Sequence, residues 1–245
     1  MKLEINVPSS ISEIPLVNYQ KFLKMQKASN DEEFIAQKMI EIFCGIQLKD
    51  VVKMKLTSVN ELIVHFQTIF AERPKFKPTF KIGEIEFGFI PDLENISFGE
   101  YVDLDNYLSK WEDFHKAMAV MYRPIKIRNK DKYEIIEYTG AGEYAELMEF
   151  APMDVAISAS VFFWTLGSEL LSATLNYLEN QLRTMNENEQ ATLAHELNSG
   201  KSGVGIAQSM DSLRETLQNT TKLLNMDYLN VLPILPSKRK KTKSN

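Results

Sequence analysis

The sequence predicts an α+β fold that is predominantly helical, with two β-hairpins packed on a helical core. Apolar residues recur at helical spacing through most of the 245-residue chain. Two short segments, residues 79–90 and 125–137, carry apolar and aromatic residues around compact polar turns, as hairpin arms do. Residues 97–122 between them return to helical spacing. The central part is therefore predicted to run hairpin, helix, helix, hairpin.

The N-terminal part, residues 1–74, is predicted to form a layer of three packed helices. Asn30 is placed to cap the second helix, and Gly45 is placed to end it. Ser58 and Glu61 have the spacing of a capping box, which predicts the start of the third helix.

Local turn and cap signals define the central part, residues 75–140. Gly83 and Glu84 form a two-residue turn in the first hairpin, and Pro91 ends its second arm. Ser97 and Glu100 have capping-box spacing at the start of the next helix. These signals explain the local structure without any catalytic chemistry.

A long core helix is predicted over residues 151–180. Apolar residues occupy nearly all sides of residues 155–166, which indicates a helix near the centre of the fold. This run of twelve residues is shorter than the roughly 20 that a membrane-spanning helix needs. We therefore expect no membrane span, with a partner-binding or membrane-active helix as the alternative.

The composition changes near residue 180 and defines the predicted domain organisation. Residues 1–180 are expected to form a single globular domain. Residues 181–209 contain few large apolar residues and are predicted to be a flexible polar, glycine-containing linker. An amphipathic helix is expected over residues 210–236 and a disordered basic tail over residues 237–245.

Charge is unevenly distributed along the chain. The formal net charge is −5, yet five basic residues lie in the last eight positions. Without them, 23 basic residues face 33 acidic ones, so the body carries −10 and repels a phosphate backbone. The tail is predicted to contact nucleic acid, to dock on an acidic surface, or to serve only as a solubilising terminus. Its basic residues are Lys238, Arg239, Lys240, Lys241 and Lys243.

The single cysteine excludes an internal disulfide and fits a reducing compartment. Cys44 ends an apolar helical pattern and is predicted to be a small core residue rather than a nucleophile. The N-terminal residues do not have the pattern of a signal peptide.

Cofactor motifs fail on spacing. Residues 200–202 resemble the end of a phosphate-binding loop, but His195 occupies the position of the required preceding glycine. His195 followed by glutamate resembles a zinc-peptidase motif, but Ser199 occupies the position of the second histidine. His65 is predicted to be a satisfied core residue and His115 a helix-surface residue. We expect no metal, nucleotide or other cofactor.

An acidic set in the central part is the candidate for catalysis. Paired carboxylates can bind Mg²⁺ or act as acid and base, and Glu100 and Asp103 can share a helix face. An unrecognised hydrolase using acids between Glu100 and Asp113 is therefore one hypothesis, and a solvated or partner-facing surface is the favoured interpretation. The set is Asp92, Glu94, Glu100, Asp103, Asp105, Glu112 and Asp113.

Aromatic and methionine residues gather at the end of the central helices. Such a cluster is typical of helix cores and also of partner grooves. Core packing is the favoured interpretation, and a partner-binding groove is the alternative. The candidate partner-binding residues are Trp111, Phe114, Met118 and Tyr122.

Three segments carry a resemblance to a known family. They read FGFIPDL at 87–93, ISFGEYVDL at 96–104 and HKAMAVMYRP at 115–124, and the similarity continues through 161–178. The chain resembles an uncharacterised family of small proteins encoded by tailed bacteriophages, including crAss-like phages. The resemblance covers most of the chain and supplies no catalytic residues.

This resemblance implies a role in virion assembly. The expected function is that of a non-enzymatic assembly factor of the tail-assembly-chaperone type, which acts in the host cytoplasm during infection. Its expected partner is a phage structural protein, such as the tape-measure protein or another tail or capsid protein. The alternative is a minor virion or cargo protein packaged in the particle, with its basic tail near DNA.

Overall fold

The computed structural model describes residues 5–130 and 132–184. Within them, contacts define two compact units: residues 5–130 with 132–159, and residues 160–184. The division lies inside the last described helix, α8 (Met153–Thr184), whereas the sequence predicted one domain over residues 1–180. The predicted linker beyond residue 184, the helix at 210–236 and the tail at 237–245 lie outside the described residues.

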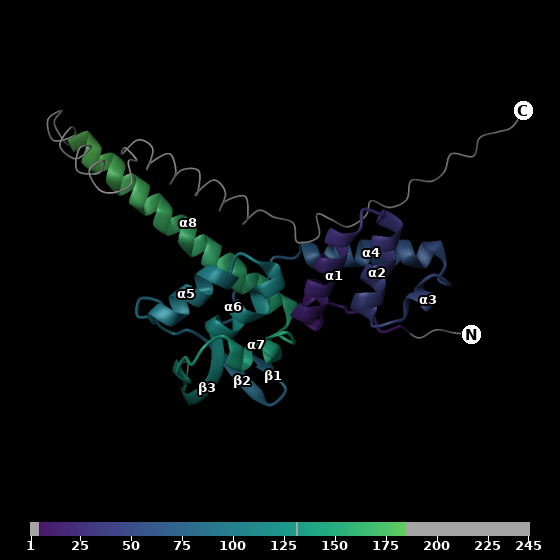
Figure 1. Cartoon of the computed structure of the whole chain (residues 1–245), viewed down its shortest axis with the longest axis horizontal. Helices are drawn as coiled ribbons and strands as arrows, with labels where there is room; N and C mark the ends of the chain where they lie inside the picture. Colours follow the sequence, from purple (N-terminus) through teal and green to yellow (C-terminus); the bar gives the residue numbers. More distant parts are fainter. Residues whose placement is uncertain (1–4, 131, 185–245) are drawn as a thin grey trace, which may run out of the picture. The chain divides into compact units, whose positions relative to one another are not determined.

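The N-terminal helices form the predicted layer (Figure 1). They are α1 (Leu16–Ala28), α2 (Glu32–Cys44), the short α3 (Leu48–Val51) and α4 (Leu56–Ala71), and a 3-10 turn, Ile11–Glu13, precedes them. Phe43 lies in the middle of an aromatic core, with ring centroids 5.3–5.4 Å from three phenylalanines of α1 and α4. The sequence did not predict α3.

Two helix starts differ from the predicted caps. Asp31, rather than Asn30, caps α2, because its carboxylate accepts from the amides of Glu33 and Phe34 at 3.0 and 3.1 Å. Helix α4 begins at Leu56, so Ser58 lies inside its first turn and makes no capping box. Gly45 ends α2 as predicted, with a left-handed φ of +64°.

The two predicted hairpins join into one antiparallel sheet. Its strands are β1 (Thr79–Ile82), β2 (Ile85–Phe89), β3 (Tyr122–Asn129) and β4 (Lys132–Ile135), in the order β1-β2-β3-β4. The hairpins meet where Phe87 and Phe89 of β2 pair with Pro124 and Tyr122 of β3. The α+β class is confirmed. The sequence placed Tyr122 at a helix end, whereas it begins β3.

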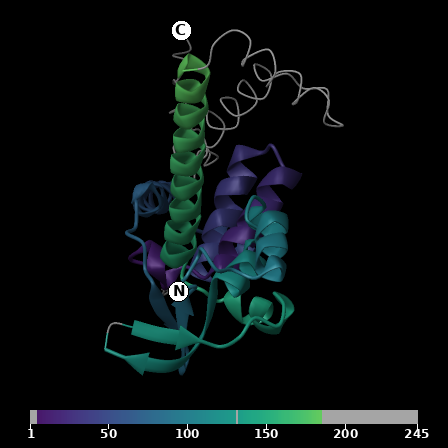
Figure 2. The same cartoon turned by 90° about the vertical axis from the view of Figure 1, so that its left-hand side faces the viewer.

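Turns and a bulge shape the sheet (Figure 2). Gly83 has φ +57° in the predicted two-residue turn between the paired Ile82 and Ile85. The register of β3 shifts between Ile125 and Ile127, so Lys126 is a bulge residue, which increases local twist.

Three further helices lie between or after the strands in the chain. They are α5 (Phe98–Tyr107), α6 (Phe114–Met121) and α7 (Gly142–Met148), with a 3-10 turn, Trp111–Asp113, before α6. Helix α6 packs against both α5 and α7. Consistent with this central position, all its residues from Ala117 to Met121 are buried.

The start of α8 is tied to the start of α1. The Leu16 amide donates to the Ala151 carbonyl, and the Met153 amide donates to the Ile14 carbonyl, each at 2.9 Å. Asp154 forms an ion pair with Lys77. These contacts and the full burial of Met153 place the beginning of α8 in the core, as predicted for a helix starting near Pro152.

Helix α8 is longer and more apolar than the twelve-residue run suggested. Met153–Tyr177 has a mean hydropathy of 1.4 over its most apolar window and is long enough to cross a membrane. It is the one such helix among residues 5–130 and 132–184. A core helix of a soluble protein has the same length and composition, so this feature is weak evidence for a membrane span.

Candidate functional site

A cavity of about 340 Å³ lies beside the start of α5. Four parts of the chain build it: the segment 90–96 after β2, Glu100 of α5, Arg123 of β3, and residues 134–137 at the end of the second hairpin. Its walls are apolar, and its polar groups are mostly acidic. The apolar residues are Ile90, Pro91, Ile96, Ile135 and Ile136, and the polar ones are Asp92, Asn95, Glu100, Arg123, Glu134 and Glu137.

Short-range hydrogen bonds fix the segment between β2 and α5. The Asp92 carboxylate accepts from the Glu94 amide at 3.1 Å and from the Asn95 side chain at 2.7 Å. The bond from Asn95 is the main reason why the pKa of Asp92 lies below its ordinary value. Asp92 is exposed and ionised, so it places a negative charge at the edge of the cavity.

The capping box of α5 positions Glu100. The Ser97 amide donates to Glu100 Oε2 at 2.7 Å, and the Glu100 amide donates to the Ser97 hydroxyl at 3.2 Å, as the sequence predicted. Glu100 is only 5% exposed. Of the acidic set, it is the member that does not belong to a solvated face.

Glu100 and Arg123 form a buried ion pair. Arg123 Nη1 donates to Glu100 Oε1 at 2.5 Å. Burial by itself raises the pKa of Glu100, but the hydrogen bonds from Ser97 and Arg123 outweigh it, so this pKa lies below its ordinary value. Glu100 is therefore ionised at neutral pH.

Arg123 retains one unsatisfied donor. Its residue is 8% exposed, and its Nε has no hydrogen-bond partner within residues 5–130 and 132–184. An unsatisfied buried donor costs about 1–3 kcal/mol relative to a satisfied one. Arg123 is thus a residue of the cavity lining whose buried Nε–H is left without an acceptor in the described part of the chain.

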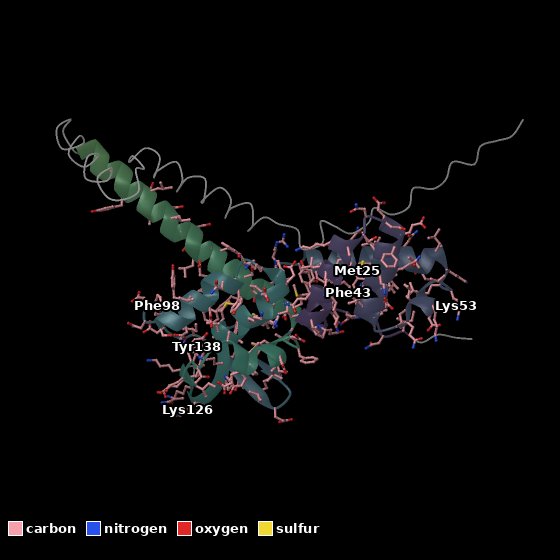
Figure 3. The ribbon with its side chains drawn as sticks, viewed as in Figure 1. Met25, Phe43, Lys53, Phe98, Lys126 and Tyr138 are labelled. Carbon is pink, nitrogen blue, oxygen red and sulfur yellow. The ribbon has the colours of Figure 1, made fainter. Side chains whose placement is uncertain are left out.

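The Tyr138 ring packs against the guanidinium of Arg123. The guanidinium lies over the Tyr138 ring at 5.5 Å, and the Tyr138 hydroxyl donates to Asp103. Burial is the main cause that raises the Tyr138 pKa, with the Asp103 contact acting in the same direction. Figure 3 labels Tyr138 between Phe98 of α5 and Lys126 of β3. Glu100 and Asp103 thus share a helix face, as predicted, and both are bound to neighbouring side chains.

The other acidic candidates are dispersed. Glu112 pairs with Lys27 and Asp113 with Lys116, while Glu94 and Asp105 are exposed. No group of three histidine, cysteine, aspartate or glutamate side chains in the described part of the chain could hold a metal ion. The structure thus brings Asp92 and Glu100 of the set together with Arg123 at the cavity and keeps Asp103 on the same helix face as Glu100. Glu94, Asp105, Glu112 and Asp113 lie outside the cavity lining.

The predicted partner-binding cluster lies mostly in the core. Phe114, Met118 and Tyr122 are each at most 1% exposed, and the Tyr122 hydroxyl donates to the Lys77 carbonyl at 2.8 Å. Their burial favours core packing over a partner groove for these three residues. Trp111 is partly buried and packs edge-on against Tyr19 at 5.3 Å.

The histidines and the cysteine occupy structural positions. His65 is partly buried, and its ring nitrogen Nε2 lies 2.7 Å from the Pro8 carbonyl oxygen. It thus has a hydrogen-bond partner, as predicted, but is not fully in the core. His115 is partly buried beside Gln20 rather than on the helix surface. Cys44 is buried, and burial raises its pKa to about 11, as fits a core thiol. His195 and the residues 200–202 lie outside the described residues, as do Lys238, Arg239, Lys240, Lys241 and Lys243.

Sequence reasoning missed Arg123 and the rim residues Glu134 and Glu137. Arg123 stands between Tyr122 and Pro124 at what was expected to be a helix end, where a long basic side chain is ordinarily exposed. In the structure Tyr122 and Arg123 begin a strand and point to opposite faces, and both are buried, so no alternation of exposure marked Arg123.

Comparisons of the chain with protein-family models, with curated proteins and with solved structures found no match.

Proposed function

We propose that this protein is a non-enzymatic assembly factor that binds a polypeptide segment, of the tail-assembly-chaperone type encoded by tailed bacteriophages. The observation that carries the proposal is Arg123, which lines an open cavity and whose buried Nε lacks an acceptor within the described structure. A polypeptide backbone supplies such an acceptor at every residue through its carbonyl group.

The surroundings of Arg123 suit an extended chain. Strand β4 is at the edge of the described sheet and pairs there with β3 alone, and residues 134–137 at its end line the cavity. Edge strands offer unpaired backbone groups to an incoming segment, which is the basis of recognition by strand addition. Apolar walls from Ile96 and Ile136 accept side chains of that segment.

The state of the acidic residues favours binding over hydrolysis. A general acid must hold a proton at working pH, and the lowered pKa of Glu100 removes that proton. Asp103 accepts a hydrogen bond from Tyr138, so it too is engaged by the fold. These carboxylates stabilise the structure around Arg123 rather than facing a reacting group.

The phage assignment comes from the sequence resemblance. Its segments 87–93, 96–104 and 115–124 include both residues of the buried pair and part of the cavity wall, namely Ile90, Pro91 and Ile96. The partner proposed on this ground is the tape-measure protein or another tail or capsid protein. The alternative of a packaged virion protein differs in one observable: mass spectrometry of purified particles detects a cargo protein and misses a chaperone.

A pull-down tests the proposal. The tagged chain is co-expressed with the tape-measure protein of the same phage, as wild type and as a Glu134→Gln/Glu137→Gln variant. The control variant is Glu61→Gln/Glu72→Gln, because both residues are exposed on or beside α4, outside the cavity lining. We expect the wild type and the control to retain the partner and the cavity variant to retain less. No retention by the wild type would overturn the proposal.

A further inference from the structure

We infer that the acidic cavity beside Arg123 binds a basic extended peptide, and that its occupant in the isolated protein is the chain's own C-terminal segment, residues 237–245. The inference deepens the proposed function and rests on it, because it names the chemistry that the same cavity recognises. Three features of the molecule support it: the charge of the rim, the shape of the interior, and the sequence of the segment.

The rim carries three exposed carboxylates, Asp92, Glu134 and Glu137. The remaining charged groups of the cavity, Glu100 and Arg123, neutralise each other in the ion pair. The cavity therefore presents a net negative rim to an incoming segment. Such a rim attracts lysine and arginine side chains and repels a phosphate backbone.

The interior suits a basic residue of an extended chain. The isoleucines of the cavity wall offer apolar surface to the methylene stem of lysine or arginine, whose charged head can then reach the rim. Arg123 lines the cavity and has a buried Nε–H without an acceptor in the described structure, which a backbone carbonyl of the same segment reaches once the guanidinium turns towards the cavity. A volume of about 340 Å³ lies at the lower end of the range for ligand pockets and suits one or two side chains.

The C-terminal segment has the required chemistry. It reads SKRKKTKSN, with five basic residues and no acidic side chain. Residues 185–236, 52 in number, connect it to Thr184, and a chain of that length reaches at most about 180 Å when fully extended. Covalent attachment gives it an effective concentration that a free peptide must exceed, so docking within one chain is favoured over capture of a separate basic peptide.

The experiment measures binding of a fluorescent peptide, residues 237–245, to the full-length chain by anisotropy. The key variant replaces the five basic residues of the chain with serine: Lys238→Ser, Arg239→Ser, Lys240→Ser, Lys241→Ser and Lys243→Ser. We expect this variant to bind the peptide at least tenfold more tightly than the wild type, whose own segment competes. We also expect binding to weaken as salt rises, because exposed charge pairs are screened.

Cavity variants are tested in the serine background. Glu134→Gln/Glu137→Gln is expected to weaken peptide binding about three- to tenfold, since two exposed charge pairs are lost. The control Glu61→Gln/Glu72→Gln makes the same charge change outside the cavity lining and is expected to leave binding within about twofold, as long-range attraction is screened. Arg123→Lys keeps a cation for Glu100 but removes the Nε donor, and it is expected to weaken binding further.

Three results would overturn the inference. One is equal peptide affinity of the wild type and the serine variant. The second is an equal effect of the cavity and control variants. The third is concentration-dependent self-association of the wild type that the serine variant abolishes, which would place the segment in a second copy. Each of these leaves the pull-down with the tape-measure protein unaffected, so failure here is distinguishable from failure of the proposed function.

Discussion

Arg123 on β3 and Glu100 on α5 form an ion pair whose side chains are 10% and 7% exposed. This pair connects the sheet to helix α5, which lies beside the cavity. Neither residue could be assigned this role from its neighbours in the sequence, since 23 positions separate them. The pair holds the guanidinium in place, while its Nε lacks a partner in the described structure. The proposed binding at this site therefore depends on structure that the ion pair maintains.

Removing one member of the pair should be strongly destabilising. Arg123→Met leaves Glu100 buried without its partner, and the expected loss is about 3–5 kcal/mol of unfolding free energy. Glu100→Gln can still accept at the capping box but leaves the arginine charge unpaired. The double variant should lose less than the sum of the two, because both charges are gone. Urea unfolding of the four proteins measures the coupling, and additive losses would show that the pair is not the connection described here.

The exposed pair between Lys27 and Glu112 is the matched control. Its side chains are 70% and 42% exposed, so solvent screens the attraction. Glu112→Gln is expected to change the unfolding free energy by less than about 1 kcal/mol.

Gly88 on β2 should not tolerate a side chain. A Cβ there would lie 2.5 Å from Cε2 of Tyr133, whose hydroxyl donates to the Phe89 carbonyl at 2.9 Å. Gly88→Ala must displace the tyrosine, and the expected cost is about 1–3 kcal/mol. Gly142→Ala is the control, because its Cβ would meet nothing within 4 Å. Thermal unfolding compares the two, and an unaffected Gly88→Ala protein would contradict the close approach of the Tyr133 ring to Gly88.

His115 should make the protein less stable in mild acid. Burial is the main cause that lowers the pKa of His115, and the positive charge of Lys116 acts in the same direction. The negative charges of Glu149 and Asp113 raise this pKa but do not outweigh burial. The Gln20 amide lies 3.0 Å from Nδ1 and also donates to the Trp111 carbonyl, so Nδ1 accepts and protonation would place two donors face to face. The unfolded state then binds more protons, and stability falls as pH drops below about 6.5 towards the folded-state pKa.

The measurement is the unfolding free energy at pH 7.5 and pH 5.5 for the wild type and for His115→Gln. We expect the wild type to lose more stability than the variant over this interval. An equal loss in both proteins would assign the pH dependence to other groups.

Cys44 should react slowly in the folded protein. Its thiol is buried, and with a pKa of about 11 it is almost entirely protonated at pH 8. The thiolate is the reactive form, so an aromatic disulfide reagent should react at least about a hundredfold more slowly with the native than with the urea-unfolded chain. Comparable rates would show that α2 opens readily at its end.

The sequence predicted local structure better than it predicted the site. Gly83, Gly45 and the Ser97–Glu100 capping box act within a few residues, so their signals are complete in the local sequence. The joining of the hairpins through Phe87 and Pro124 is a long-range pairing, which no local pattern specifies. The same holds for Arg123, whose partner, ring contact and cavity come from three separate segments.

Site-specific crosslinking tests the central claim most directly, namely that the cavity beside Arg123 binds a polypeptide segment. A photoreactive phenylalanine replaces Glu137 or Asp92, which are exposed and line the cavity, or Glu61, an exposed residue of α4 that does not. The chains are co-expressed with the tape-measure protein and irradiated. Our account predicts crosslinked partner at positions 137 and 92 and little at position 61. Equal crosslinking at all three positions, or none at 137 and 92, would contradict it.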